Sequence, residues 1–355
     1  MNLMQHRINL RDDYSISRVI KGGWQLAGGH GSIDEAQAIA DMREFVSAGI
    51  TTFDCADIYT GVEELIGKFL RTHRHEFASG ELPPVQVHTK YVPDLDALAT
   101  ITKSDTEKII DRSLRRLGVE RLDLVQFAWW DYSVPRYVEV CLHLAELQKA
   151  GKIRYIGVTN FNVKSLRDML NAGCPIITNQ VQYSVLDRRP AGPMQEFIQQ
   201  HDMSYLCYGS VAGGFLTEKY LGATERQYAE NRSLVKYQLI IDEIGGFDQF
   251  QHLLQILKSI AAKHDVSIAE VAAQYVLQQN GVAAVIIGAR NARHLQSLQK
   301  MAGLKLGTAE IGKIQSLINK GKAVPGDVYD IERDRHGRHG RIMRYNLNQS
   351  VTNSK

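Results

Sequence analysis

Cysteine is scarce in this sequence, and no segment is apolar enough to cross a membrane. The chain has four cysteines in 355 residues, and none of them forms a CxxC pair, which excludes a disulfide scaffold. No stretch approaches 18 consecutive apolar residues, and the polar N-terminal residues lack the apolar core of a secretory signal. We therefore expect a reduced, cytoplasmic protein.

The sequence also lacks an excess of charge of either sign. Its 42 basic and 39 acidic side chains give a formal net charge of +3. This balance predicts neither a nucleic acid nor an anionic membrane as a partner. There is no Gly-x-Ser-x-Gly elbow for a hydrolase, and no clustered His/Cys pattern for a metal, so we expect no metal site.

What recurs is an alternation of short apolar runs with amphipathic helical stretches. The expected strands are 19–21, 51–54, 86–90, 122–127, 153–158, 176–180, 204–208 and 282–287. Eight such units predict a single-domain (β/α)8 barrel over residues 1–324. The competing doubly wound sheet is disfavoured, because its G-x-G-x-x-G fingerprint is absent after the first strand.

Three further features concern connections and the C-terminal end. Ser32 and Glu35 have the spacing of a capping box, which predicts a helix starting there. Residues 209–246 are expected to form a long irregular loop, and long loops are usually functional. The polar tail 325–355 is expected to lie on the barrel or to be partly disordered.

The carboxyl ends of barrel strands are where catalytic residues gather. Asp54 ends the second expected strand, Tyr59 follows it, and Lys90 ends the third. A lysine ammonium favours the phenolate and lowers the pKa of a nearby tyrosine, and an aspartate can hold that lysine charged. Such a tyrosine can protonate a carbonyl oxygen. Any one of these residues alone is more often a structural hydrogen bonder; the three together predict a proton-transfer site.

Seven segments, in order and at matching spacing, resemble the aldo-keto reductase family. They are FDCADIY at 53–59, ELIG at 64–67, SLRRLG at 113–118, LDLVQ at 122–126, GVTNF at 157–161, NQVQY at 179–183 and IGAR at 287–290. The resemblance covers roughly residues 17–320. It implies the (β/α)8 barrel, the nicotinamide cofactor NADPH or NADH, and reduction of aldehydes and ketones or the reverse reaction.

The resemblance also implies roles for individual residues. Asp54, Tyr59 and Lys90 match three of the family's four catalytic positions. The nicotinamide carboxamide would be held by Asn160 and Gln180 with Thr159 beside them, and the ring would stack on Tyr208. The remaining positions implied to bind the cofactor are Trp24, Gly209, Ser210, Gly213, Leu216, Gly288, Ala289, Arg290 and His294.

The fourth catalytic position of the family, a histidine, is occupied by Ala128. A methyl group cannot donate the hydrogen bond that orients the carbonyl oxygen, and losing such a donor costs on the order of 10²–10³ in rate. His88 is a possible replacement, but we expect it to be a buried structural histidine inside the barrel. His30, in the glycine-rich loop after the first strand, is a second candidate.

The adenosine end also departs from the family, with His294, Ser297 and Leu298 at positions where other residues are usual. Arg290 still suits a 2′-phosphate, because a guanidinium binds phosphate with two parallel hydrogen bonds, so we expect NADPH rather than NADH.

Three classes of function remain open. The first is an NADPH-dependent carbonyl reductase or alcohol dehydrogenase acting on a small carbonyl or alcohol. The second is a redox-neutral enzyme for elimination, isomerisation or cyclisation, and the third is a dinucleotide-binding partner protein with weak catalysis. For an enzyme, the expected substrate pocket is lined by Tyr59, Trp129, Trp130 and Tyr91.

Overall fold

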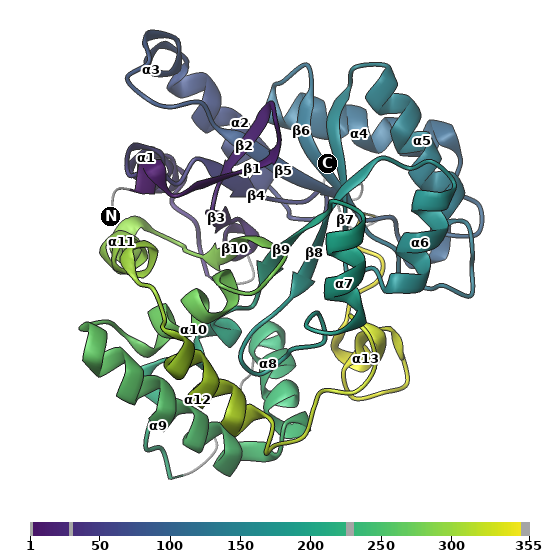
Figure 1. Ribbon diagram of the computed structural model, residues 1–355. Helices are drawn as coiled ribbons and strands as arrows, with labels where there is room; N and C mark the ends of the chain where they lie inside the picture. The colour runs from purple at the N-terminus through teal and green to yellow at the C-terminus, as the bar shows by residue number, and fades with distance from the viewer. Residues whose placement is uncertain (1–2, 28–30, 225–230, 349–355) are drawn as a thin grey trace.

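The computed structural model describes residues 3–27, 31–224 and 231–348. Eight parallel strands close into a barrel in the order β10-β3-β4-β5-β6-β7-β8-β9 (Figure 1). They are β3 (Val19–Gly22), β4 (Thr52–Asp54), β5 (Gln86–Tyr91), β6 (Leu122–Phe127), β7 (Ile153–Thr159), β8 (Ile176–Gln182), β9 (Ser204–Tyr208) and β10 (Val282–Gly288). The predicted barrel is confirmed, and an open sheet is excluded because β10 pairs with both β3 and β9.

Alternation along β5 shows how the barrel aims its side chains. His88 and Lys90 point into the barrel, where His88 meets Tyr14 and Lys90 meets Asp54. Thr89 points the other way and donates a hydrogen bond of 2.6 Å to Glu63 in the helix α2 (Val62–Thr72). Successive residues of a strand face opposite sides, so Lys90 at the strand's carboxyl end reaches the mouth of the barrel.

Helices surround the barrel and connect its strands (Figure 1). They are α1 (Glu35–Ser47), α2 (Val62–Thr72), α3 (Arg74–Ser79), α4 (Lys103–Leu117), α5 (Tyr137–Lys149), α6 (Val163–Asn171), α7 (Pro193–Gln200), α8 (Arg232–Glu243), α9 (Gly246–His264), α10 (Ile268–Leu277), α11 (Leu295–Gly303), α12 (Thr308–Ile318) and α13 (Asp330–Arg333). The expected capping box at Ser32 is wrong. Asp34 caps α1 instead, because its side chain accepts a hydrogen bond from the Gln37 amide.

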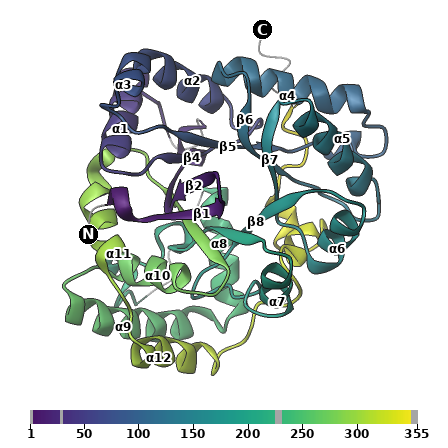
Figure 2. The same ribbon diagram turned by 45° about the horizontal axis from the view of Figure 1, so that its top comes forward.

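An antiparallel hairpin of β1 (Arg7–Arg11) and β2 (Tyr14–Ser17) precedes the barrel and was not predicted. Its apolar residues Leu10, Tyr14 and Ile16 are buried with side chains from the barrel interior. Figure 2 shows the hairpin lying across one end of the ring of strands. The hairpin therefore closes the end of the barrel opposite the strand carboxyl ends.

The connection 209–246 is less irregular than expected, because it contains α8. Asn231 caps this helix, and its side chain accepts a hydrogen bond from the Ser233 amide. Figure 1 shows α8 and the tail helix α13 on the same side of the barrel, near β8 and β9. The Lys236 ammonium of α8 lies 5.3 Å from the ring centroid of Tyr329, the residue before α13.

The C-terminal segment up to residue 348 packs on the barrel. The Leu95 amide donates to the Tyr345 carbonyl over 2.9 Å, and the Asn348 side chain donates to the Val92 carbonyl over 2.7 Å. Arg189 binds Glu332 of α13 over 2.8 Å and Asp187 over 2.7 Å. Asp187, Arg189 and Glu332 are all buried, so this ion cluster anchors α13 to the loop after β8.

Within residues 3–27, 31–224 and 231–348, no helix is both long enough and apolar enough to cross a membrane. In the same ranges, no group of three or more His, Cys, Asp or Glu side chains is arranged to hold a metal ion.

Candidate active site

Asp54 and Lys90 form a buried ion pair at the mouth of the barrel. The Lys90 ammonium lies 2.6 Å from one carboxylate oxygen of Asp54 and 3.0 Å from the Cys55 carbonyl oxygen. The other oxygen of Asp54 accepts hydrogen bonds from Gln126 over 2.9 Å and from Gln180 over 2.7 Å. Burial alone would lower the pKa of Lys90, but Asp54 and Tyr59 raise it, so the ammonium stays charged.

Tyr59 stands beside this ion pair. Its ring centroid lies 5.2 Å from the Lys90 ammonium and 5.0 Å from the ring centroid of Trp24. Burial raises the pKa of Tyr59, and the opposing effect of the Lys90 charge is smaller. The expected lowering of this pKa by Lys90 is present, but burial outweighs it and keeps the pKa above its usual value. The phenol is protonated at neutral pH and can act as a proton donor.

Ala128 follows β6, and its amide donates to the Tyr91 carbonyl over 2.9 Å. Its methyl side chain offers no hydrogen bond at this strand end. His88 does not replace the missing donor, because it is fully buried and its Nε2 lies 3.0 Å from the Tyr14 hydroxyl. Burial lowers the pKa of His88 to about 3, so His88 is a neutral core residue, as expected. His30, the other candidate, lies outside the described residues, as do Gly28 and Gly29.

Of the aromatic residues other than Tyr59 expected to line a substrate pocket, two are buried away from the barrel mouth and one lies near it. Tyr91 is fully buried; its ring packs on Phe127, and its hydroxyl lies 3.3 Å from Thr106 of α4. Trp129 is 2% exposed, and its indole donates to main-chain carbonyls of its own loop. Both therefore pack in the layer between strands and helices, because alternation turns them away from the barrel axis. Trp130 remains near the mouth, where its ring meets Tyr345 of the tail.

Asn160 and Tyr208 meet at the ends of β7 and β9. Asn160 has a left-handed backbone with φ of 61°, and its side-chain oxygen accepts a hydrogen bond of 2.9 Å from the Tyr208 hydroxyl. Thr159 donates to the Gln180 carbonyl over 3.2 Å. The Gln180 side chain itself points toward Asp54 and also donates to Gln126 over 2.7 Å. Gln180 thus joins the carboxylate network as well as lying next to Asn160.

The stretch from Gly209 to Leu216 has the character of a backbone cradle. Gly209 and Gly213 have positive φ values of 73° and 64°, a region that L side chains rarely adopt. The Ser210 hydroxyl is buried and has no hydrogen-bond partner within the described residues. An orphaned buried hydroxyl beside flexible glycines suits a polar ligand such as a dinucleotide phosphate. Leu216, at the end of this stretch, is fully buried.

The predicted adenosine-end residues follow β10. Arg290 is exposed and donates a hydrogen bond to the Ser32 carbonyl, and its guanidinium lies beside Gly31. Gly288 faces the Gln25 side chain, and Ala289 is buried. His294 is exposed at the end of a short 3-10 helix, Ala292–His294. This group lies along the same edge of the barrel as Trp24, because β10 pairs directly with β3.

Three residues at the mouth were not predicted. Gln126 was noted only as part of a motif, although it stands two residues before Ala128 and so shares its side of β6. Lys236 comes from α8, and its ammonium donates to the Tyr208 hydroxyl over 3.2 Å. Arg333 of α13 donates to the Asn160 carbonyl over 2.6 Å. Both come from segments whose contacts with the barrel have no local sequence signal.

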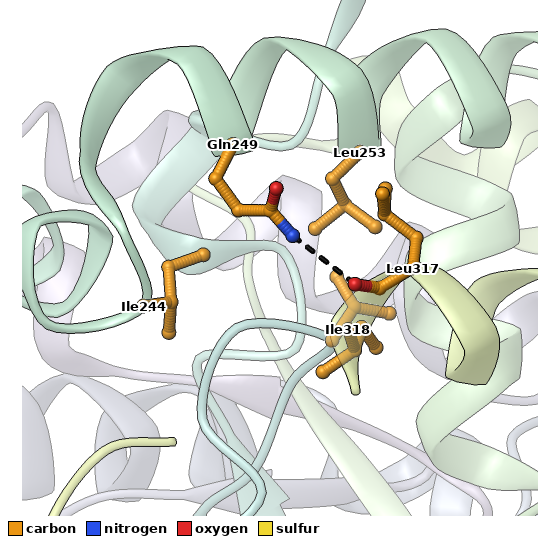
Figure 3. A pocket seen from close by; sticks show the side chains of 6 residues that line it. Ile244, Gln249, Leu253, Leu317 and Ile318 are labelled. Atoms are coloured by element: carbon orange, nitrogen blue, oxygen red, sulfur yellow. Dashed lines mark hydrogen bonds between the residues drawn. The ribbon is translucent and has the colours of Figure 1, made fainter. Parts of the chain in front are cut away.

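A small apolar pocket lies elsewhere, outside the barrel (Figure 3). It is lined by Val185, Ile244, Gln249, Leu253, Leu317 and Ile318. Its polar member, Gln249, already donates to the Leu317 carbonyl over 3.1 Å. The pocket contains no titratable group and is separate from the residues at the mouth.

The comparisons with known proteins agree with the barrel fold. The family described as "Aldo/keto reductase family" matches residues 18–319. The chain is 27% identical to aldo-keto reductase YhdN of Bacillus subtilis over 308 residues, which cover 85% of this chain and 90% of the relative.

Two solved structures share the fold. Glycerol dehydrogenase AKR11B4 from Gluconobacter oxydans has a TM-score of 0.74 and 24% identity, covering 91% of this chain and 98% of its own. An aldo/keto reductase from Klebsiella pneumoniae in complex with NADP and acetate has a TM-score of 0.67 and 19% identity, covering 91% and 97%. Because the family match spans most of the chain, this protein belongs to the aldo/keto reductase family and is an oxidoreductase.

Proposed function

We propose that this protein is an NADPH-dependent carbonyl reductase that also runs in reverse as an alcohol dehydrogenase on a small-molecule substrate. The observation that carries the proposal is the buried Asp54–Lys90 ion pair beside the protonated phenol of Tyr59. A bound dihydronicotinamide supplies the hydride that adds to the carbonyl carbon.

Tyr59 is the proton donor in this proposal. As negative charge develops on the carbonyl oxygen, the Tyr59 hydroxyl delivers its proton to that oxygen. The Lys90 ammonium, 5.2 Å from the phenol ring, stabilises the phenolate that remains. Asp54 holds the ammonium in position over 2.6 Å and keeps it charged.

With Ala128 in place of a histidine, this site stabilises negative charge on the carbonyl oxygen less well than a site with all four catalytic residues of the family. Only the phenol would donate to the carbonyl oxygen, because the methyl group has no donor and His88 is bound to Tyr14 inside the barrel. Loss of one oxyanion donor lowers the rate by about 10²–10³. We therefore expect slow reduction, or a substrate that carries its own hydrogen-bond donor into the space beside Ala128.

For the cofactor, we assign the carboxamide end to Asn160 with Thr159 and Gln180, and the ring to Tyr208. The residues Trp24, Gly209, Ser210, Gly213 and Leu216 would hold the middle of the dinucleotide, and Gly288, Ala289, Arg290 and His294 its adenosine end. The orphaned Ser210 hydroxyl supports this assignment. The exposed guanidinium of Arg290 and the NADP in the Klebsiella pneumoniae relative support a phosphorylated dinucleotide.

The test measures NADPH oxidation with a panel of aldehydes, ketones and sugars. Tyr59→Phe is the matched control, because it removes only the donating hydroxyl. We expect turnover by the wild type that the control lacks. If the wild type oxidises no more NADPH than Tyr59→Phe across the panel, the proposal fails. If a substrate is converted without net change in NADPH, a redox-neutral reaction at the same residues replaces it.

A further inference from the structure

Residues 55–61 connect β4 to α2 and carry Tyr59, and Asp57 ties this loop to β5. The Asp57 amide donates to the Lys90 carbonyl over 3.3 Å, and the Asp57 side chain accepts hydrogen bonds from the Val92 amide over 3.2 and 3.3 Å. Asp57 is fully buried, so these bonds lie in a medium of low dielectric constant that strengthens them. The Tyr59 loop is therefore held against the strand end from which Lys90 reaches the mouth.

Helix α4 supports the same loop from outside the barrel. Its Arg116 donates to the Asp57 main-chain carbonyl over 3.0 Å and to the carboxylate of Glu63 over 3.2 Å. Glu63 of α2 is fully buried and accepts the hydrogen bond from Thr89 of β5. These bonds join α4, α2 and β5 into one network beneath the loop that carries Tyr59.

The C-terminal segment reaches this network through Asn348. Its side-chain oxygen accepts a hydrogen bond from Arg112 of α4, and its side-chain nitrogen donates to the Val92 carbonyl over 2.7 Å. Its main-chain amide donates to Asp94 over 2.9 Å. The Arg112 guanidinium lies 3.8 Å from the Asp57 side chain. Asn348 thus joins Arg112 to the segment that follows β5, next to Asp57.

Asp57 depends on these neighbours because it is buried. Burial raises the pKa of Asp57 to about 8, and the charge of Glu63 adds to this effect. Arg112, the Val92 amide and a hydrogen bond from the Asn348 side chain oppose it, because each favours the ionised carboxyl group. Removing the Asn348 side chain therefore leaves a buried polar group with fewer partners, which costs free energy in the present arrangement of the loop.

We propose that Asn348 is a positioning residue for Tyr59 and that it acts through Asp57. Asn348 helps to hold Asp57 and Arg112 in place, and Asp57 in turn fixes the Tyr59 phenol beside the Lys90 ammonium. The inference rests on the proposed function, because it uses Tyr59 as the proton donor. A displacement of about 1 Å at a reacting group costs up to about 10²-fold in rate, so a contact remote from the chemistry can still control it.

The experiment compares Asn348→Ala with Asn346→Ala. Asn346 is the matched control, because it is a neighbouring asparagine whose side chain donates to the exposed Asp96 over 2.7 Å. The measurements are kcat and KM for NADPH-dependent reduction of the best aldehyde from the panel, and the dissociation constant of NADPH by fluorescence titration. Asn348→Ala should lower kcat by about tenfold to 10²-fold with an unchanged dissociation constant, whereas Asn346→Ala should behave like the wild type.

Variants of Asp57 test the route of the effect. Asp57→Asn keeps the size of the side chain and the oxygen that accepts from the Val92 amide, so it should retain most of kcat. Asp57→Ala loses that oxygen and should lower kcat at least as much as Asn348→Ala. If Asn348 acts through Asp57, the double variant Asp57→Ala/Asn348→Ala should be no slower than Asp57→Ala alone, because residues that share one interaction are not additive.

Each other outcome has a defined meaning. If Asn348→Ala is folded by circular dichroism and keeps the wild-type kcat, the positioning role is overturned while the proposed function stands. Weaker NADPH binding at unchanged kcat also overturns it, since the tail would then serve the cofactor. Losses that multiply in the double variant would show that Asn348 acts independently of Asp57; if Asp57→Ala does not fold, the kcat of Asn348→Ala against Asn346→Ala decides. If the wild type itself oxidises no more NADPH than Tyr59→Phe, the proposed function fails and this inference with it.

Discussion

Arg333 reaches from the C-terminal helix α13 to the main-chain carbonyl of Asn160, 2.6 Å away. The same guanidinium lies 4.2 Å from the ring centroid of Tyr132 and 3.3 Å from the Trp129 carbonyl oxygen. Asn160 has a left-handed backbone conformation, which asparagine adopts more often than most other non-glycine residues. A residue near the end of the chain thus steadies the residue assigned to the nicotinamide carboxamide.

Arg333→Ala should therefore weaken cofactor binding more than it changes the chemical step. Losing a hydrogen bond from a charged donor corresponds to roughly a tenfold or larger loss in the dissociation constant for NADPH. Arg335→Ala is the control, because Arg335 is exposed and its ion pair with Asp131 is 3.6 Å long. Equal dissociation constants for both variants, measured by fluorescence titration, would show that Arg333 does not position Asn160.

Ala128→His should increase reductase activity by about 10²-fold, because it restores a donor to the carbonyl oxygen. The double variant Tyr59→Phe/Ala128→His is the control and should stay at the background rate, since the proton donor is absent. The measurement is kcat/KM for NADPH-dependent reduction of the best aldehyde from the panel. Unchanged or lower activity would mean that Ala128 serves a different substrate or chemistry.

The pH dependence of reduction follows from the direction of the Tyr59 shift. Burial raises the pKa of this phenol, so the proton-donating form persists at higher pH than in a free tyrosine, which titrates near 10. We expect kcat/KM for reduction to stay level through neutral and mildly alkaline pH. It should fall only as the pH rises past about 10. A falling limb centred well below that value, in protein still folded by circular dichroism, would contradict this role for Tyr59.

Arg290→Ala should distinguish the two dinucleotides. A guanidinium that binds a 2′-phosphate contributes to NADPH affinity and not to NADH affinity, so NADPH alone should bind about tenfold more weakly or worse. Arg293→Ala is the control, because Arg293 is an exposed arginine of the adjacent 3-10 helix, Ala292–His294. If Arg290→Ala weakened the binding of NADPH and NADH equally, Arg290 would contact a part of the dinucleotide that both share.

Glu332→Gln should loosen the C-terminal segment. Glu332 is fully buried, and although burial opposes its ionisation, Arg189 lowers its pKa to about 2. Breaking a buried ion pair costs about 3 kcal/mol of the free energy of unfolding. The exposed pair of Arg136 and Glu139 gives the control Glu139→Gln, which should cost less than about 1 kcal/mol. Urea unfolding and limited proteolysis of residues 327–348 measure both effects; similar costs would contradict an anchoring role.

The barrel was predictable because its signal is local. Strands buried on both faces are short apolar runs, and each of the eight expected runs is a strand of the barrel. The hairpin carried a signal that was missed: Ile8 and Leu10, then Tyr14 and Ile16, alternate with polar residues around Asp12 and Asp13. The sequence also contained a missed signal for helix α8, because Asn231, a residue type that caps helices, precedes apolar residues at helical spacing.

Local sequence also placed Asp54, Tyr59, Lys90, Asn160 and Tyr208 at strand ends, and parallel strands bring such ends together whatever the loops do. The protonation of these groups depends on the tertiary structure. Burial raises the pKa of Tyr59 and the Lys90 charge lowers it, and the effect of burial is the larger.

The sequence by itself determined the barrel, the family and the residues that gather at its mouth, because these follow from periodicity and spacing along the chain. Only the tertiary structure decided what covers that mouth. Lys236 reaches Tyr208 from 28 residues away, and Arg333 reaches Asn160 from 173 residues away. Contacts between such distant positions depend on how the elements pack, and no local pattern in the sequence encodes them.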